Sequence, residues 1–425
     1  MSEKIPPTLS LALRSLFNRR VTAALTVAAI AVSVALLLGV QMLRTAARES
    51  FANTVSGVDL IVGARSGPLN LLLYSVFRVG DATANVSWAS YQKIAHHPDV
   101  AWTIPISLGD SHRGFRVMGT SQSYFDHYRY GDGRALQFAA GDRFRDLYDA
   151  VLGADVARAL GYKVGDSIIV AHGIGNVSFA EHKDKPFRVA GILRKTGTPI
   201  DRTVHVGLEA ITAIHIDWQS GLQAPAGFRV SAEETRQRDL TPDTITAFLV
   251  GMRSKVMTFT MQRAINDYRQ EPLLAVLPGV ALSQLWDLVG IADTALAVVA
   301  GCVVLAGLLG MLTAILTSLN ERRREMAILR SVGARPTHIF SLMMLEAGAL
   351  AMAGVLSGIV LTYGLLALAR PVLENRFGIF VRIAPLGRVE IFILLSIILV
   401  AFLMGLVPAF RAYRNALSDG LQVRV

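Results

Sequence analysis

An uncharged apolar run of 23 residues, Val21 to Leu43, constrains this chain more than any other feature. About 20 helical residues cross the hydrocarbon core of a bilayer, so residues 21–43 are predicted to form a first transmembrane segment. A cleaved signal peptide would have a shorter apolar core, of about 7 to 15 residues, and a small-residue cleavage site, which is not evident before Arg44. We therefore expect an uncleaved span.

Three further apolar runs have the length of membrane spans: residues 288–319, 340–369 and 390–410. Four spans place both termini on one side of the membrane. Twelve Lys and Arg residues lie on the side of the termini, against four on the other side in the short loop between the last two runs. Because basic residues accumulate in cytoplasmic segments, we expect a multi-pass membrane protein with both termini cytoplasmic.

This topology assigns the shorter segments. They are a cytoplasmic amphipathic helix at residues 1–20, a cytoplasmic charged helix at 320–339, a short extracytoplasmic loop at 370–389 and a cytoplasmic tail at 411–425.

Residues 44–287 lack long apolar runs and alternate strand-like and helix-like stretches. They contain 26 basic and 24 acidic residues, whereas the other 16 basic and 8 acidic residues flank the apolar runs. The excess of positive charge therefore indicates membrane topology and argues against a nucleic-acid-binding surface. The predicted fold class is an α-helical membrane protein with four transmembrane helices, and a large extracytoplasmic mixed α/β domain with a stalk, inserted between helices 1 and 2.

Within this domain, β-branched and aromatic residues bounded by Gly, Pro or Asp predict strands. The expected strands are residues 114–118, 167–171, 187–193, 203–206 and 246–252, and the expected helices are residues 154–160 and 255–268. In the second helix, Val256, Phe259, Thr260, Arg263 and Ala264 recur at helical spacing and are expected to pack on a sheet.

The charged segment at residues 320–339 separates the second and third apolar runs. It begins NERRRE, after which Met326, Leu329 and Val332 recur at helical spacing before Gly333. A short amphipathic helix of this kind can lie at the bilayer surface and offer one face to a soluble partner. A solvated loop between spans is the alternative, and these features alone favour neither.

The sequence contains no G-x-x-x-x-G-K-[ST] phosphate-binding loop. Energy from ATP would therefore reach these residues through a partner. No Ser, His and Asp arrangement is readable as a catalytic triad, so we expect a noncatalytic subunit without a cofactor of its own. Cys302 is the only cysteine, which excludes an internal disulfide.

The segment ERRREMAILRSVGARPTHIFSLMMLEAG resembles the signature of the MacB/FtsX/LolC family of ABC-transporter permeases. The matching positions are Glu321, Arg322, Glu325, Met326, Leu329, Arg330, Gly333, Ala334, Glu346 and Ala347. LALRSLFNRRVTAALTVAAIAVSVAL is similar to the family's first helices. VPAFRAYRNAL is similar to its closing P-A-x-R-A motif, although Asn415 and Ala416 stand where the family often has Asp-Pro. FRVMGTSQSYF, VLGADVARALGYKVGDSIIV and FRVAGILRKTGTPIDRTVHVGLEAI are similar to its extracytoplasmic core domain.

The resemblance implies the permease subunit of an ATP-driven ABC transporter complex in the bacterial cytoplasmic (inner) membrane. A separate cytoplasmic ABC ATPase would bind ATP and magnesium, and a second copy or a sister permease would complete the pair. Membrane lipids and a periplasmic or lipoprotein partner are further expected contacts, whereas nucleic acid is not. The implied ATPase-docking residues are Glu321, Arg322, Arg323, Arg324, Glu325, Met326, Leu329, Arg330, Gly333 and Ala334.

Three functions remain open at this point. In the first, motion of the ATPase is transmitted to the extracytoplasmic domain and moves a hydrophobic, lipidated or small-molecule substrate. In the second, the same motion controls an external hydrolase or sensor without transport. In the third, the chain is a component of metal uptake.

Two features of the apolar segments are candidates for contacts. The run LNLLLYSVF in the external domain is either a buried strand or helix or an apolar lip that touches substrate or lipid. The contact residues would be Leu69, Leu71, Leu72, Leu73, Tyr74 and Phe77.

Glu346 is an intramembrane polar residue near the start of the third span, where burial would favour a specific partner such as an arginine of the coupling helix.

Eight of the nine histidines lie in the external domain: His96, His97, His112, His127, His172, His182, His205 and His215. Imidazole is a common zinc ligand, but no pair has convincing ligand spacing with a third carboxylate. The sequence therefore predicts no metal site.

Overall fold

The computed structural model describes residues 19–52, 54–131, 133–173, 182–219, 222–223, 230–321, 323–373 and 385–414. The predicted helix at residues 1–20 and the tail from residue 415 thus lie almost wholly outside the described residues. The chain divides into two compact units. Among the described residues, the first unit holds residues 19–45, 290–371 and 385–414, and the second holds residues 46–289 and 372–373.

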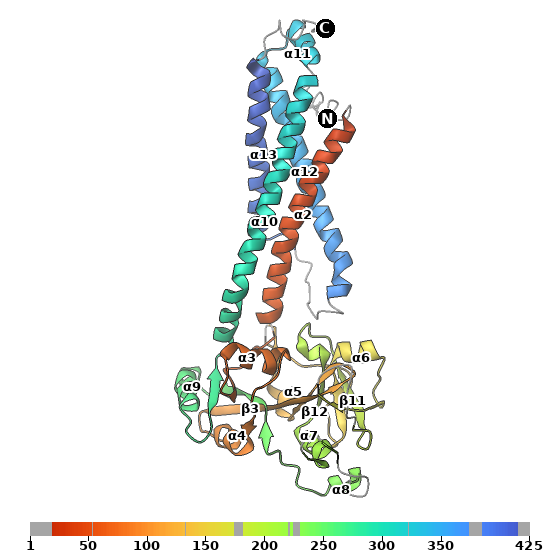
Figure 1. Cartoon of the computed structure of the whole chain (residues 1–425), viewed down its shortest axis with the longest axis vertical. Coiled ribbons are helices and arrows are strands. Elements are labelled where there is room, and N and C mark those ends of the chain that lie inside the picture. The colour runs from red at the N-terminus through yellow and green to blue at the C-terminus, as the bar shows by residue number, and fades with distance from the viewer. Residues whose placement is uncertain are drawn as a thin grey trace, which may run out of the picture. The chain divides into compact units, whose positions relative to one another are not determined.

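The first unit is helical. Its long helices lie side by side in Figure 1, and a short charged helix, α11, follows α10. The helices are α2 (Arg20–Ala52), α10 (Pro278–Glu321), α11 (Arg323–Ser331), α12 (Pro336–Val372) and α13 (Arg388–Arg414). All except α11 are long and apolar enough to cross a membrane, and the candidate spans are Arg20–Ala46, Gly290–Leu319, Pro336–Val372 and Arg388–Arg414.

The four long helices share one apolar core, to which each contributes: Ile30 and Val34 from α2, Met311 from α10, Ala351 and Val355 from α12, and Ile397 from α13. Small residues allow α2 and α12 to approach closely. A Cβ atom added to Gly354 would lie 2.5 Å from Ile30 Cγ2, and one added to Gly358 would lie 2.7 Å from Val34 Cβ. Glycine at these two positions is therefore required by packing.

The second unit is a mixed α/β domain built on an 11-stranded sheet, with the main order β17-β1-β16-β3-β4-β12-β8-β11-β7. β10 also pairs with β3 and β9 with β11. β12 is parallel to β4 and β11 to β8, and the other pairs are antiparallel. In sequence order the strands of this sheet are β1 (Leu60–Ala64), β3 (Val100–His112), β4 (Phe115–Thr120), β7 (Phe138–Gly141), β8 (Asp149–Leu152), β9 (Ser167–Ile168), β10 (Ala171–His172), β11 (Phe187–Leu193), β12 (Thr203–Gly207), β16 (Ala247–Met252) and β17 (Leu273–Val276).

Three small two-stranded sheets complete the strands: β2 (Val86–Ser87) with β15 (Thr244–Ile245), β5 (Arg129–Tyr130) with β6 (Arg134–Ala135), and β13 (Trp218–Gln219) with β14 (Leu222–Gln223). The short helices are α3 (Pro68–Leu72), α4 (Trp88–Ala95), α5 (Ser123–His127), α6 (Ala154–Leu160), α7 (Leu208–His215), α8 (Ala232–Thr235) and α9 (Thr258–Asn266). A π-helical turn covers Leu73–Phe77, and 3₁₀ turns cover Pro199–Arg202 and Lys255–Met257.

The central strands are buried on both faces of the sheet. Along β1 and β16, alternate residues enter two different apolar clusters, as the two-residue period of a strand requires. The segment α3 and its π-helical turn cover one face with Leu71, Leu72, Tyr74 and Phe77, which are all less than 9% exposed. The predicted lip is therefore a buried core segment at these four positions, and only Leu69 and Leu73 of the predicted contact residues are partly exposed.

Several sequence predictions for this domain are confirmed, and two are wrong in detail. β4, β11, β12, β16 and α6 lie where they were expected, whereas the strand predicted at residues 167–171 is divided into β9 and β10. The face predicted for α9 is also wrong. Val256 and Phe259 are 84% and 67% exposed, and the side chains buried on the sheet are Thr258, Met261 and Ile265.

Candidate functional site

The helix α11 ends in a left-handed glycine. Gly333 has φ of 103°. The Ala334 amide donates to the carbonyl oxygen of Leu329 at 3.0 Å, so this carbonyl in the last turn of the helix has a hydrogen-bond partner. Pro336 then opens α12, where proline is tolerated because the first turn has no amide partner. The sequence G-A-R-P thus separates α11 sharply from the span that follows.

One side of α11 is anchored. Met326 and Ala327 are 6% and 5% exposed, and Met326 packs with side chains at the ends of three long helices, including Leu319 of α10, Ile339 of α12 and Ala412 of α13. α11 is thereby coupled by packing to the ends of α10, α12 and α13.

The other side of α11 is open. Ile328 is 51% exposed and Val332, one turn later, is 84% exposed. The apolar stripe predicted from Met326, Leu329 and Val332 is correct at two positions and wrong at the third. Met326 is buried against the bundle and Leu329 is partly buried, whereas Val332 is 84% exposed and lies beyond the last helical residue. Ile328, which is not among the predicted docking residues, shares the exposed side.

The predicted docking residues differ in how far they are described. Glu325 and Gly333 are exposed, and Leu329, Arg330 and Ala334 are partly buried. Arg322 lies outside the described residues, as do the side chains of Glu321, Arg323 and Arg324. ATPase docking at these positions stays a prediction.

Glu346 is 4% exposed on α12. It lines a small cavity of about 30 Å³ together with Arg19, Thr22, Thr26 and Ser318. The Arg19 guanidinium donates to the Ser318 hydroxyl at the same place. The basic residue that lines this cavity with Glu346 is thus Arg19, directly before α2, and a contact of Glu346 with an arginine of the coupling helix stays a prediction.

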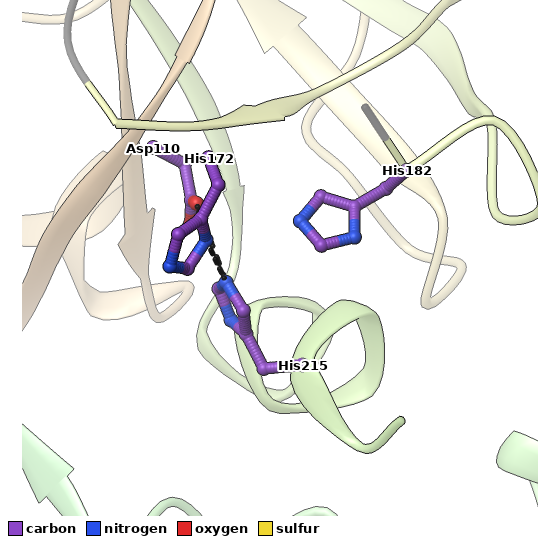
Figure 2. A group of neighbouring side chains, drawn as sticks. All are labelled: Asp110, His172, His182 and His215. Atoms are coloured by element: carbon purple, nitrogen blue, oxygen red, sulfur yellow. Dashed lines mark hydrogen bonds and ion pairs between the residues drawn. The ribbon is translucent and has the colours of Figure 1, made fainter. Parts of the chain in front are cut away.

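A second group of chemically active side chains lies in the α/β domain (Figure 2). Asp110, His172, His182 and His215 each offer one ligand atom, and these four atoms all lie within 4.8 Å of one another. His172 Nδ1 and His215 Nε2 lie 3.2 and 3.3 Å from Asp110 Oδ1, and 2.9 Å from each other. Figure 2 shows the His182 ring facing this triangle.

Four separate segments supply these residues. Asp110 and His172 are register partners of the antiparallel strands β3 and β10, and His215 is the last residue of α7. His182 precedes β11, and its amide donates to the Val170 carbonyl oxygen at 3.0 Å. A buried ion pair, Lys185 Nζ to Asp217 Oδ2 at 2.7 Å, joins the segment of His182 to the segment that follows His215.

The surroundings set the protonation of the group. Burial would raise the pKa of Asp110, but its contacts with His172 and His215 outweigh burial and lower this pKa to about 2. Burial lowers the pKa of His182 to about 4, so this imidazole is neutral at pH 7. The contact with Asp110 raises the pKa of His172. The group is therefore a carboxylate beside at least one neutral imidazole, a donor set that suits borderline metal ions.

The linear sequence did not reveal this group. The three histidines were all noted, but their spacing matches no zinc motif, and Asp110 stood out in no pattern. The feature that brings the group together is the pairing of residues 110 and 172 on neighbouring strands, and this pairing is known only once the fold is known.

Comparisons with known proteins decide the family. The model described as the MacB-like periplasmic core domain matches residues 23–266, and the model described as the FtsX-like permease C-terminal matches residues 297–417. The chain belongs to the MacB/FtsX/LolC-type family of permeases. The predicted fold class is confirmed, since a mixed α/β domain of the MacB-like periplasmic type lies between the first and second of four candidate spans.

A curated relative in the MacB family is the macrolide export ATP-binding/permease protein MacB of Azoarcus sp. (strain BH72). It is 24% identical over 384 residues, which are 86% of this chain and 52% of the relative. The chain thus spans about half the length of this relative.

Two solved structures resemble the chain. One is the periplasmic region of MacB from Actinobacillus actinomycetemcomitans, with 11% identity, a TM-score of 0.34, and coverage of 55% of this chain and 94% of that one. The other is the extracellular domain of the noncanonic ABC-type transporter YknZ from Gram-positive bacteria, with 12% identity, a TM-score of 0.30, and coverage of 52% and 98%.

Proposed function

We propose that this MacB/FtsX-type permease is the noncatalytic subunit of an ATP-driven complex, in which α11 docks a cytoplasmic ATPase and passes its motion to the α/β domain. The observation that carries the proposal is the two-sided character of α11. Met326 is buried among the ends of α10, α12 and α13, while Ile328 and Val332 are exposed. Apolar side chains exposed beside charged ones are typical of a protein-docking surface.

The helix α10 is the proposed path of transmission. It runs without interruption from Pro278 to Glu321 and contains no proline after its first residue. Helices bend sharply mainly at proline or where the hydrogen-bond ladder is broken, so a continuous helix moves as a stiff rod. In this proposal both termini and α11 are cytoplasmic, the α/β domain is extracytoplasmic, and a second permease copy or a sister permease completes the complex.

Transport of a small molecule is favoured over extrusion of a lipidated one. Burial of Leu71, Leu72, Tyr74 and Phe77 removes the apolar lip that suggested a lipid-like substrate. The α/β domain instead carries an open cavity of about 640 Å³, within the usual range of ligand sites, whose lining includes Gln122, Asp146, Glu209 and Arg236. A signalling permease that controls an external hydrolase or sensor needs no such cavity.

Metal uptake is a second candidate, because Asp110, His172, His182 and His215 converge in the external domain. It predicts that cells lacking this chain accumulate less of one transition metal when that metal is scarce. Unchanged metal content in such cells would exclude it.

Co-purification tests the docking proposal. We expect the double substitution Ile328→Glu and Val332→Glu to abolish recovery of the ATPase with the full-length permease in detergent, because two charges would face the apolar contact. Val256→Glu is the matched control, since Val256 and Val332 are both 84% exposed. Equal ATPase recovery with the double variant and the control would refute docking at α11.

A further inference from the structure

We infer that Asp110, His172, His182 and His215 form a binding site for one divalent transition-metal ion of the zinc class. Such a site would suit a permease that moves the metal as well as one that only carries it. It is independent of docking at α11.

The distances within the group fit a tetrahedral ion. Zinc binds imidazole nitrogen and carboxylate oxygen at about 2.0–2.1 Å, so the ligand atoms of a tetrahedral site lie about 3.3 Å apart. The three separations among Asp110 Oδ1, His172 Nδ1 and His215 Nε2 are 3.2, 3.3 and 2.9 Å. The His182 donor lies within 4.8 Å of these atoms, so one side chain has to move inward to complete the shell.

The group also contains one buried imidazole that lacks a hydrogen-bond partner among the described residues. His182 is 0% exposed, and neither of its ring nitrogens has a hydrogen-bond partner among the described residues. Asp110 is 2% exposed, and its Oδ1 atom lies 3.2 and 3.3 Å from ring nitrogens of His172 and His215, where its negative charge would also attract a cation. A buried polar atom without a partner destabilises the folded state, and a bound cation would give the His182 ring a partner while it neutralises Asp110.

The orientation of His215 supports ligation. Its Nδ1 lies 2.7 Å from the Ile211 carbonyl oxygen one turn earlier in α7, so Nδ1 carries the proton and donates it. Nε2 is then the ring nitrogen that lies beside Asp110 and His172, and a metal ion would bind there in place of a proton. Metal-binding histidines characteristically donate their second ring nitrogen to a backbone carbonyl in this way.

The donor set selects the class of ion. Three imidazoles and one carboxylate suit zinc and its neighbours and are poor ligands for Mg²⁺ or Ca²⁺, which prefer oxygen. Four protein ligands leave no open position, which is typical of sites that hold an ion rather than hydrolyse a substrate. His172 is 46% exposed, so the ion can enter from solvent on that side.

Trp218 provides a natural reporter of binding. Its ring stacks on His172 with centroids 5.7 Å apart and lies edge-on to His182 at 5.1 Å. A paramagnetic ion held between these histidines would quench Trp218 fluorescence, and zinc would reverse the quenching by displacing that ion.

The test uses the full-length permease in detergent, freed of metal with a chelator and titrated with Co²⁺. We expect one equivalent to bind with the intense visible bands of four-coordinate Co²⁺ and with quenching of Trp218, and Zn²⁺ to reverse both signals. Asp110→Asn and His215→Gln should each weaken binding by at least about 100-fold. His96→Gln combined with His97→Gln is the control, because both histidines are exposed elsewhere in the domain.

Asp110→Asn keeps the shape of the side chain, so its elution in size-exclusion chromatography and its circular dichroism serve as the check on folding. Equal Co²⁺ affinity in the native chain and in a folded Asp110→Asn variant would overturn the inference. So would the weak bands of six-coordinate Co²⁺, or a loss of binding in the His96 and His97 control as large as in the ligand variants.

Discussion

His172 and Asp110 are cross-strand partners of β10 and β3, and His172 Nδ1 lies 3.2 Å from Asp110 Oδ1. Directly opposed residues of an antiparallel pair have side chains on the same face of the sheet. The pairing register therefore brings these two side chains together, and α7 and the segment before β11 add His215 and His182 to them.

The buried ion pair of Lys185 and Asp217 should stabilise the α/β domain, because it joins the segment of His182 to the segment that follows His215. Asp217→Asn leaves the Lys185 ammonium, 1% exposed, without its counterion, and it weakens the contact of Asp217 with the Val230 amide. We expect a loss of about 3–5 kcal/mol in unfolding free energy, measured by denaturant unfolding of the full-length chain in detergent. Asp142→Asn, which breaks an exposed pair with Arg145, should leave the unfolding midpoint unchanged. Equal midpoints for the two variants would contradict this assignment.

Acid should destabilise the α/β domain through His205. Burial, and then the charge of Arg78, lower the pKa of His205 to about 3, while the unfolded chain has an ordinary value of about 6.5. The unfolded state therefore binds the proton first. Stability is complete above about pH 6.5 and falls by up to about 1.4 kcal/mol per pH unit toward pH 3. His205→Gln should flatten this slope in denaturation series at several pH values. An unchanged slope would show that His205 does not titrate in this way.

The close contact of α2 with α12 should tolerate no additional methyl group. Gly354→Ala places a Cβ atom 2.5 Å from Ile30, so we expect a loss of about 1–3 kcal/mol in stability from overpacking. Gly364→Ala on the same helix meets no atom within 4 Å and should leave stability unchanged or raise it slightly. Thermal unfolding in detergent compares the two. A Gly354→Ala variant as stable as Gly364→Ala would rule out the packing of α2 on α12.

Transmission along α10 should fail when the helix is broken. Ala297 is exposed within the second span, and proline at this position removes a backbone hydrogen bond and kinks the helix. We expect Ala297→Pro to keep ATPase co-purification while it abolishes transport or signalling, because α11 stays anchored. Ala297→Leu is the control. Full activity of the proline variant would exclude α10 as the path.

The sequence predicted the spans and many strands because their patterns are local. An uncharged apolar run longer than 20 residues, or a short strand such as β11, can be recognised from neighbouring residues in the sequence alone. The buried face of α9 was not predictable in the same way. Val256 and Phe259 are apolar, but so are Met261 and Ile265, and only the position of the helix on β17 and its neighbours decides which pair is buried.

The metal-site candidate was less predictable still. Its four residues come from four segments. The spacing of these residues in the sequence does not show that β10 pairs with β3 in the register that brings Asp110 and His172 together. The run at residues 69–77 was ambiguous for a related reason. Leu71 and Tyr74 are apolar whether they face lipid or the sheet, and the close approach of Gly63, where an added Cβ would lie 2.6 Å from both side chains, shows which face they cover.

Motion that begins at the ATPase should change the position of the α/β domain relative to the helical unit, and a distance between the two units measures this change most directly. Spin labels would be placed at Val256→Cys and Thr337→Cys, both exposed positions, in a Cys302→Ser background and in the complex with its ATPase in lipid. We predict that the label-to-label distance distribution shifts when ATP binds and returns after hydrolysis. Identical distributions with and without ATP, in a complex that still hydrolyses ATP, would contradict the account.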